Sequence, residues 1–526
     1  MITQVLCPAK LGDFIQASAM IRSLAGPEGD GIQLLALDPT VLEAQRLLFP
    51  KAEGILLYPR ELGIGDGGKD AGVGVTGPWD GGQAPGDGGS QAGTGDRPFT
   101  GVASRAEPGQ PGPARPARRA DLLVNLSVDA RAVRYAASLG PKEILGPRPE
   151  GDGVWIPPAQ RLAMAAMALD RRLGRLNITD VWRSLRPESP ADLAVPPAWP
   201  KLGGEPKDAL KGTEKLPLVS FHLGARGPMR RWPVESHARL AAELFGLMPF
   251  HAAVLGSRSE RSMALRFAKE LKELEPNAPP AVILSGMTSL SDLWVLLSIS
   301  DFLVSSDTGV MHLAAAVGIS QLAVFAGPAY AHETGPYNRL ALVVQGLAPC
   351  GPCVEGKGCT RKTCRAMPHP HCALPAAAEL IGEDDQDRIQ AQSGNGAADQ
   401  NARVEFWETG IDRAGAYLAP WGERRAELDH TSLAALLFRE GTRAVAGLYG
   451  PAGGDRSGTA ASVFKKASET VSKEIALYKI NDSIDKAKVR SYLAHIEKKA
   501  LEGKDRLIFR EVWEGLLAEF ILRFAL

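Results

Sequence analysis

The chain has 526 residues, of which 44% are hydrophobic and 23% charged, so it can bury large cores and should divide into two or three domains. Lysine plus arginine and aspartate plus glutamate both total 60, which excludes a net field that recruits nucleic acid or an anionic membrane. The longest apolar run, Leu313 to Ala331, is broken by two glycines and a proline, and this pattern fits a helix followed by a strand rather than a membrane span.

Short apolar strands alternate with helices in the first part of the chain, as in a parallel α/β sheet. We expect these elements at residues 2–6, 14–24, 34–37 and 121–126. Between them, residues 63–119 are rich in Gly, Pro, Asp and Ala and cannot bury enough apolar surface to offset their entropy, so we expect a disordered insertion. The sequence predicts a first Rossmann-like domain at 1–205 and, because Lys10 interrupts any signal-peptide pattern, a cytoplasmic protein.

The same alternation returns after a Pro-rich passage at 187–216, which we interpret as an interdomain linker. We expect strands at 218–223, 252–255, 281–284 and 299–304, and helices at 236–247, 260–274 and 291–298. These elements predict a second Rossmann-like domain at 215–382. A helical extension follows at 400–526, and its last helix repeats apolar residues every four positions from Ile508 to Phe524. That stripe must pack either on the body of the protein or on a second subunit of an oligomer.

Asp307-Thr308-Gly309 stands where an apolar strand gives way to an Ala-rich helix. The start of a helix offers unpaired amide groups and the positive end of the helix dipole to an anion, and glycine lets the backbone approach a ligand closely. The pattern predicts a diphosphate site. The alternative is an ordinary helix start with Asp307 as the N-cap.

Asp13 holds a similar position between the first strand and the first helix. Ligands of open α/β sheets lie at the carboxyl ends of the strands, so Asp13 should face the cleft between the two domains, where it can act as a general base. Its alternative role is again an N-cap. In the second domain, the loop 224–233 carries three arginines that suit a pyrophosphate, or else form a solvated basic loop. Glu260 suits ribose hydroxyls, and a helix-start glutamate explains it equally well.

Five segments occur in the order Leu11-Gly12-Asp13, Arg231-Trp232-Pro233, Gly286 to Leu290, Asp307 to Ala316 and Phe325 to Pro328. Together they resemble the ADP-heptose:lipopolysaccharide heptosyltransferases, glycosyltransferase family 9, over about residues 1–60 and 120–380. The resemblance implies a GT-B fold, in which two Rossmann-like domains face each other across a cleft. It also implies inverting transfer of a sugar, usually heptose, from an ADP-activated donor, without a metal in the chemistry.

The resemblance also implies roles for individual residues. Asp13 falls on the catalytic base, Arg230 on a lysine that contacts the donor phosphates, and Glu260 on an acidic residue near the ribose. The remaining donor-binding positions surround the diphosphate and the adenine: Thr288, Asp307, Thr308, Gly309 and His312. For the acceptor, Lys10 and Gly12 are the candidates, because Cys7 stands where the family often carries Lys or Arg.

Five of the six cysteines lie close together, at Cys350, Cys353, Cys359, Cys364 and Cys372. Four of the five can supply thiolates to a structural Zn or Fe, and some protein-modifying members of the family carry an iron-binding finger. The alternative is a set of unligated or redox-active thiols. Asp385-Gln386-Asp387 has the form of a metal-binding Asp-x-Asp, but it lies in a polar tract without a preceding strand, which favours a solvated linker.

The sequence therefore predicts a cytoplasmic glycosyltransferase with acceptor binding in the N-terminal half and ADP-sugar binding in the C-terminal half. The expected acceptor is a hydroxyl of the lipopolysaccharide core or of a protein, reached by peripheral contact at the inner face of the inner membrane. Two alternatives remain open: a binding module that has lost activity, and a sugar-nucleotide epimerase of the same fold.

Overall fold

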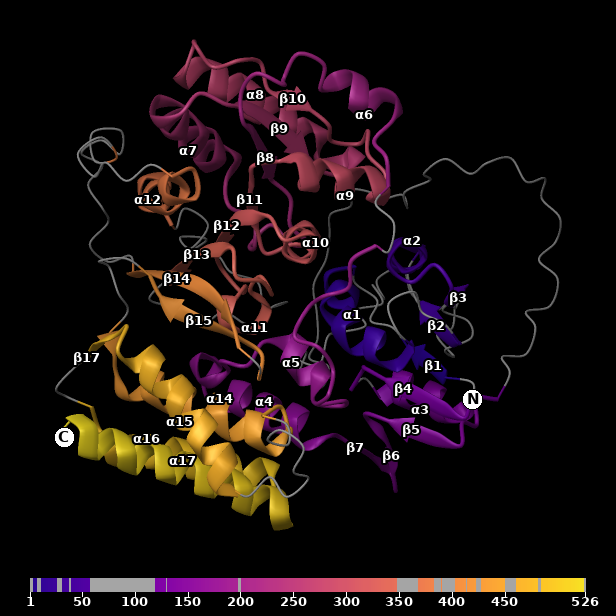
Figure 1. Ribbon diagram of the computed structural model, residues 1–526, viewed down its shortest axis with the longest axis vertical. Coiled ribbons are helices and arrows are strands. Elements are labelled where there is room, and N and C mark those ends of the chain that lie inside the picture. The colour runs from indigo at the N-terminus through magenta and orange to yellow at the C-terminus, as the bar shows by residue number, and fades with distance from the viewer. Residues whose placement is uncertain are drawn as a thin grey trace, which may run out of the picture.

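In the described part of the protein, two large sheets and two small ones are accompanied by helices (Figure 1). The computed structural model describes residues 3–6, 11–25, 31–36, 39–56, 119–128, 130–196, 200–347, 368–382, 389, 403–412, 414–421, 427–449, 460–480 and 484–524. The predicted insertion at 63–119, the Asp385–Asp387 segment, Cys7 and Lys10 lie outside these residues, apart from position 119.

The N-terminal lobe is built on a five-stranded parallel sheet in the order β3-β2-β1-β4-β5. Its strands are β1 (Thr3–Leu6), β2 (Ile32–Ala36), β3 (Glu53–Leu56), β4 (Leu122–Asn125) and β5 (Glu143–Leu145), and its helices are α1 (Leu11–Ala25), α2 (Pro39–Leu48) and α3 (Ala130–Ser138). A small hairpin follows, β6 (Arg148–Glu150) and β7 (Gly153–Trp155). Val5 in the central strand lies opposite Leu34 and Val124, and all three are buried, as expected of a parallel sheet covered on both faces.

The C-terminal lobe is built on an eight-stranded sheet in the order β10-β9-β8-β11-β12-β13-β14-β15. Its strands are β8 (Leu218–His222), β9 (His251–Leu255), β10 (Val282–Ile283), β11 (Phe302–Ser306), β12 (Ser320–Phe325), β13 (Ala341–Leu347), β14 (Arg403–Ile411) and β15 (Ala416–Pro420). Its helices are α7 (Val234–Leu247), η3 (Arg258–Glu260), α8 (Arg261–Leu274), α9 (Leu290–Ile299), α10 (Gly309–Val317), α11 (Ala331–Thr334) and α12 (Pro370–Leu380). The first six strands are parallel, and β14 and β15 are antiparallel additions at one edge.

The predicted α/β organisation is confirmed, with one shift in a boundary. The sequence predicted a strand from Ile299, whereas α9 continues through Ile299 and β11 begins at Phe302. The helix persists because the amide of Ser300 still donates to the carbonyl of Leu296, at 3.1 Å, so Ile299 belongs to the last helical turn. The apolar run from Leu313 is a helix and a strand, as expected.

Four short helices connect the lobes: α4 (Pro158–Leu169), η2 (Arg171–Leu173), α5 (Ile178–Arg183) and α6 (Gly204–Ala209). They do not form a plain linker. The helix α5 packs on α1, whereas α4 and η2 pack against α14 and α4 also contacts α16, far along the chain (Figure 1). The apolar side chains of Leu162, Ala166 and Leu173 belong to the same core as these C-terminal helices.

The C-terminal extension, residues 403–524, contains more than helices. It begins with β14 and β15, which extend the sheet of the C-terminal lobe, and it also contains β16 (Glu427–Leu428) and β17 (Lys479–Ile480). Its helices are α14 (His430–Val445), α15 (Ala460–Ile475), α16 (Lys486–Ala500) and α17 (Gly503–Phe524). The predicted apolar stripe of α17 buries Val512, Leu516 and Phe520 in the core shared with α14 and α15, so these residues pack on the protein's own body.

A buried network of charged side chains joins the extension to the rest of the protein. Arg443 of α14 donates to the carbonyl of Ala416 at 2.7 Å and to Glu440 at 3.2 Å, and it lies 3.9 Å from Asp180 of α5. Asp180 in turn accepts from Arg183 at 2.9 Å. Buried charges are tolerated only when each one has partners, and this network gives each arginine several. It therefore fixes α5, α14 and the β14–β15 hairpin in one arrangement.

Among the described residues, none of the helices combines the length and the apolar character needed to cross a bilayer.

Candidate functional site

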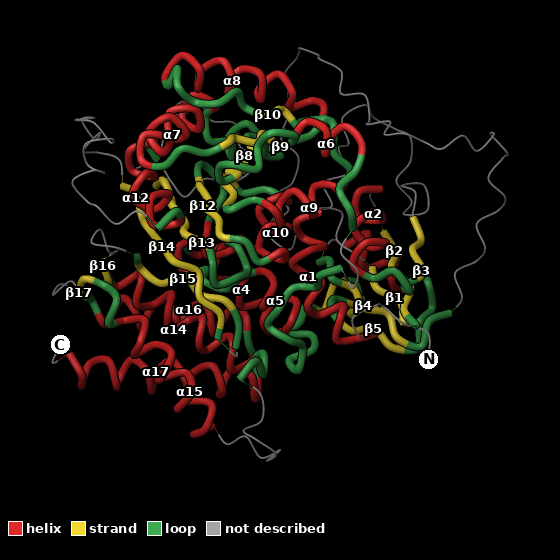
Figure 2. The backbone as a smooth tube through the Cα atoms, turned by 45° about the horizontal axis from the view of Figure 1, so that its top comes forward, coloured by secondary structure: helices red, strands yellow, loops and turns green. Residues whose placement is uncertain are grey.

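The carboxyl ends of the parallel strands of the C-terminal lobe form one polar edge, which faces the start of α1. The residues that follow β8, β9, β10 and β11 all emerge at this edge because parallel strands end on the same side of a sheet. In Figure 2, α10 of the C-terminal lobe lies beside α1 of the N-terminal lobe, and the two helices are in contact. The two lobes therefore meet where the sequence places its site motifs.

Gly12 lies directly against the start of α10. A Cβ atom at this position would stand only 2.7 Å from Cδ2 of His312 and 3.5 Å from the Cα of Gly309. Real Cβ atoms do not come so close to other atoms, so only glycine allows this approach of the two lobes. Asp13 is the next residue, in the first turn of α1 and half-buried. The structure thus brings together Gly12, Gly309 and His312, with Asp13 adjacent in sequence.

The start of α10 has the form expected of an anion site. Thr308, not Asp307, is the N-cap: its φ is −148° and its side chain accepts from the amide of Met311 at 3.3 Å. The alternative role of Asp307 as N-cap is therefore wrong. The amides at this helix start point toward the polar edge of the sheet, and the nine-residue helix adds its dipole.

Asp307 pairs instead with Arg230, whose Nη1 donates to Oδ2 of the carboxylate. Arg230 belongs to the loop after β8, and this loop is fixed by the amide of Trp232, which donates to Oγ of Ser306 at 3.1 Å. The indole of Trp232 also donates to the carbonyl of Pro368 at 2.7 Å. The predicted phosphate-binding arginine is thus anchored to the strand end that precedes the Asp-Thr-Gly turn.

His312 is buried beside this ion pair. Burial lowers the pKa of His312 to about 4, Asp307 opposes that shift and Arg230 adds to it, so the imidazole is neutral at neutral pH. Its Nδ1 atom is buried and finds no hydrogen-bond partner within the described part of the chain. A buried nitrogen without a partner costs free energy, which a ligand oxygen at this position would recover.

Glu260 lies at the next strand end, at the start of α8. Its Oε2 accepts from the amide of Ser257 at 2.7 Å and from Oγ of Ser257 at 2.8 Å, which makes it part of a capping box. The helix-start role that the sequence left open is therefore present in the structure. A Cβ atom on Gly224 would collide with the same carboxylate, so the loop after β8 passes directly over Glu260. His222 Nε2 lies 3.8 Å from its Oε2.

Thr288 lies in the loop between β10 and α9, half-buried. This loop is joined to the loop after β9, because the amide of Gly286 donates to the carbonyl of Gly256 at 2.9 Å. Thr288 is therefore on the same edge as Glu260 and at a separate strand end from the group formed by Arg230, Asp307 and His312. The adenine contact of Thr288 and the diphosphate contacts of the other group stay predictions.

Four of the five clustered cysteines, at 350, 353, 359 and 364, lie outside the described residues. Cys372 is buried in α12, with its Sγ 3.3 Å from Nε2 of His371. Within the part of the chain that the structure describes, no three His, Cys, Asp or Glu side chains are arranged to hold a metal ion. The metal prediction accordingly gains no support from the structure.

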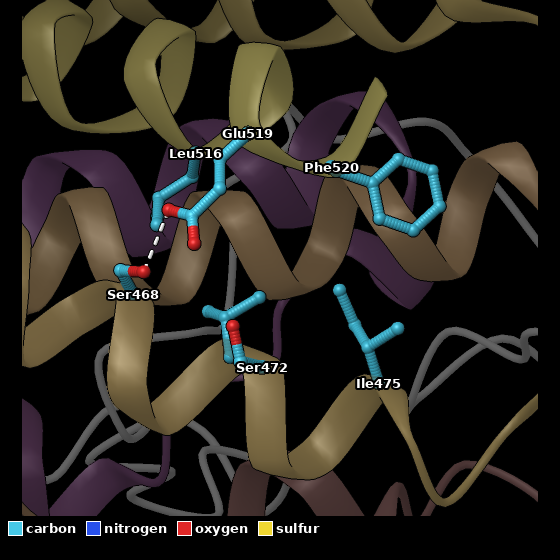
Figure 3. Close-up of a pocket in the computed structure, with 7 residues that line it drawn as sticks. Ser468, Ser472, Ile475, Leu516, Glu519 and Phe520 are labelled. Atoms are coloured by element: carbon cyan, nitrogen blue, oxygen red, sulfur yellow. Dashed lines mark hydrogen bonds between the residues drawn. The ribbon is translucent and has the colours of Figure 1, made fainter. Parts of the chain in front are cut away.

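A small hollow lies between α15 and α17 of the C-terminal extension (Figure 3). It is lined by Ser468, Ser472, Ile475, Leu516, Glu519 and Phe520, and Ser468 donates to Glu519 at 2.6 Å. Its mostly apolar walls belong to the packing of the extension, so we assign it no function.

The sequence did not predict two charged residues that join this site. Arg171 of η2 donates to Glu333 of α11 through Nε, at 2.8 Å from Oε1, and through Nη2, at 2.6 Å from Oε2. The two residues are 162 positions apart and neither belongs to a recognisable motif. The signal that was available is the position of Glu333 just after β12, at the same strand edge as the predicted site.

Two Rossmann-like lobes meet at the start of α1 and α10, with a cationic loop beside a helix start, and this arrangement is that of a GT-B fold. Residues 168–363 match the family model described as glycosyltransferase family 9 (heptosyltransferase). Through this region, which is less than half of the chain, the chain is similar to that family.

Individual relatives agree with the family model. A lipooligosaccharide heptosyltransferase 2 of Haemophilus ducreyi is 31% identical over 138 residues, which are 26% of this chain and 39% of the relative. A lipopolysaccharide heptosyltransferase 2 of Escherichia coli is 29% identical over 161 residues, which are 29% of this chain and 45% of the relative. In these matches the chain spans less than half the length of each curated relative. The solved E. coli ADP-heptose lps heptosyltransferase II shares 17% identity, with a TM-score of 0.45, over 72% of this chain and 98% of that one.

Proposed function

We propose that the protein is an inverting glycosyltransferase that moves heptose from ADP-heptose to a hydroxyl group of the lipopolysaccharide core. The observation that carries this proposal is the close approach of Gly12 to His312 and Gly309. It sets the carboxylate-bearing start of α1 against the start of α10, where a diphosphate would bind. The names of the similar proteins supply the sugar and the acceptor.

The reaction follows from the roles of these groups. Asp13 removes the proton from the acceptor hydroxyl, and the oxygen forms a bond to the anomeric carbon of the sugar. The bond from that carbon to the diphosphate oxygen breaks on the opposite face, so the configuration inverts. The leaving ADP keeps the electron pair, and its charge is stabilised by Arg230 and the amides at the start of α10.

Each of the two lobes binds one of the two substrates. On this proposal the region 1–205 binds the acceptor, with Lys10 and Gly12 as the candidate acceptor-binding residues, and 215–382 binds the ADP-sugar. Thr308, Gly309 and His312 surround the diphosphate, Thr288 the adenine and Glu260 the ribose. The enzyme would act in the cytoplasm, at the inner face of the inner membrane, where a lipid acceptor is within reach.

The test is to incubate the purified protein with ADP-heptose and lipopolysaccharide that lacks core heptose, and to follow the product by mass spectrometry. We expect the acceptor mass to rise by one heptose. Conversion of the donor without an acceptor would indicate an epimerase, and binding without any conversion would indicate a binding module; either result contradicts the proposal.

The variant Asp13→Asn should lower the transfer rate by at least about 100-fold, because an amide cannot accept the proton, while the affinity for ADP survives. The matched control is Asp152→Asn, which changes an exposed carboxylate in the turn between β6 and β7 and should keep the normal rate. Rapid turnover by Asp13→Asn would remove this residue from the mechanism.

A further inference from the structure

Arg171 and Glu333 form a forked ion pair between the two halves of the chain. Arg171 stands in η2, on the segment that connects the lobes, and Glu333 stands in α11 after the fifth parallel strand of the C-terminal lobe. Nε and Nη2 of the guanidinium donate to the two carboxylate oxygens at 2.8 and 2.6 Å. Such a fork fixes the plane and the direction of the guanidinium group.

The loop that leads to Glu333 touches the loop that carries Arg230, because a Cβ atom on Gly327, between β12 and α11, would stand 2.3 Å from the carbonyl oxygen of Met229. Burial raises the pKa of Glu333, Arg171 and Arg230 oppose that shift, and Asp307 adds to it. The charge of Arg230 also acts on Arg171. These four side chains are therefore close enough to share one electrostatic environment, although they come from four separate elements.

The two arginine side chains of this group are more exposed than the two carboxylates. Arg171 and Arg230 remain 17% and 19% exposed, whereas Glu333 and Asp307 are both 4% exposed. The two carboxylates are thus almost fully covered, whereas both arginine side chains keep part of their surface open. An arrangement that binds an anion requires cations that a ligand can reach.

The backbone of η2 is also fixed by contacts of the residues on either side of Arg171. Asp170 caps it by accepting from the amide of Arg172 at 3.0 Å, and Leu173 is fully buried in the core that α4 shares with the extension. Arg175 donates to the hydroxyl of Tyr478 and lies over the ring of Trp407, with Cζ 5.3 Å from the ring centre. The C-terminal extension therefore fixes the segment that carries Arg171, which lowers the entropy cost of using this side chain in binding.

We propose that Arg171 is a donor-binding residue, which together with Arg230 holds the diphosphate of the nucleotide-sugar from the side of the connecting segment. This assignment rests on the proposed function. Each phosphate of a sugar-linked diphosphate carries one negative charge, and the two guanidinium groups match the two charges.

Two substitutions in the Arg171–Glu333 pair distinguish a role of Arg171 in ADP binding from a role that only joins two parts of the chain. Arg171→Gln removes the cation, and it should weaken the binding of ADP by about tenfold, the loss of one charge-assisted hydrogen bond. Glu333→Gln breaks the same ion pair but keeps the cation, and it should tighten ADP binding by about threefold, because a carboxylate near the phosphates disappears. ADP affinity is measured by titration calorimetry on the full chain, and melting temperatures are recorded for both variants.

Arg172→Gln is the matched control. Arg172 is the neighbouring residue, 48% exposed, and its ion pair with Asp170 lies outside the cluster. This variant should bind ADP as the wild type does. Weaker binding by Arg171→Gln and Glu333→Gln to the same extent would show a cross-link alone and overturn the assignment.

The same measurements distinguish the assignment from the proposed function. Arg230→Gln provides the reference for a damaged diphosphate site. If the wild-type protein binds no ADP, the proposed function fails and this assignment fails with it. If the wild type and Arg171→Gln bind ADP equally while Arg230→Gln does not, only the role of Arg171 is wrong.

Discussion

Arginine and carboxylate pairs occur in two regions of this protein and differ in how fully they are buried. In the extension, Arg439 and Arg443 are at most 1% exposed and share Glu440 as a partner, and Arg439 also pairs with Glu474. At the polar edge, Arg171 and Arg230 keep part of their surface open while their carboxylates are covered. The same chemistry therefore fixes a structure in one place and presents cations to a ligand in the other. The difference lies in the access of solvent to the guanidinium groups.

The largest effect should come from breaking the buried network. Arg443→Met leaves Asp412 without its ion-pair partner and Glu440 with Arg439 alone, and it should lower the free energy of unfolding by about 4 kcal/mol. Urea denaturation at neutral pH measures this change. Arg172→Met, which breaks an exposed pair, is the control and should cost at most about 0.5 kcal/mol. Equal losses in the two variants would mean that burial does not distinguish the pairs.

Lowering the pH should lower the stability of the protein through two buried histidines. Burial lowers the pKa of His312 and of His237 to about 4, from 6.5 for an ordinary histidine. The unfolded chain binds these protons more tightly, so stability is full above pH 6.5 and falls as the pH drops toward 4. A change from pH 7 to pH 5 should cost about 2 kcal/mol for each histidine.

Urea titrations of the wild type and of His312→Gln at both pH values measure this dependence. The variant should lose about half of the pH effect that the two histidines produce. If its stability changes with pH as much as that of the wild type, protonation of His312 is not the cause.

The smallest effect should come from the contact between the lobes. Gly12→Ala places a methyl group against His312 and should cost about 1 kcal/mol of stability, because the imidazole or α1 must shift. The apparent affinity for the donor should fall in the same variant, as measured by the KM for ADP-heptose. Gly151→Ala is a poor control because its φ is +55°, whereas Gly203→Ala meets no atom within 4 Å and is suitable. An unchanged KM in Gly12→Ala would show that the helix contact does not shape the donor site.

The sequence was sufficient for the elements whose signals are local. The strands before Asp13, Gly224 and Asp307 are short and fully buried, and each is followed by a helix. The N-cap of α10 is Thr308 and not Asp307, because Asp307 pairs with Arg230, 77 positions away. Pairing at that distance is decided by tertiary structure, and no local pattern reports it.

The C-terminal extension also shows what local sequence patterns fail to predict. The stretch Arg403 to Ile411 alternates apolar and polar residues around Phe406, which is a strand signal, but it follows a long polar tract and was interpreted as part of a helical tail. The ion pair between Arg171 and Glu333 was not predicted, because the closeness of η2 and α11 depends on helices from the end of the chain that hold η2 in place.

The antiparallel addition of β14 to β13 has a practical consequence for anyone who shortens this protein. Six residues of β13 pair with β14, and most of β13 is buried and apolar. A chain cut before residue 403 would leave β13 as an edge strand, with its amides and carbonyls unpaired. Such a strand can pair with the edge strand of another molecule. Trimming the protein to its two lobes would therefore favour insoluble aggregates over a minimal enzyme.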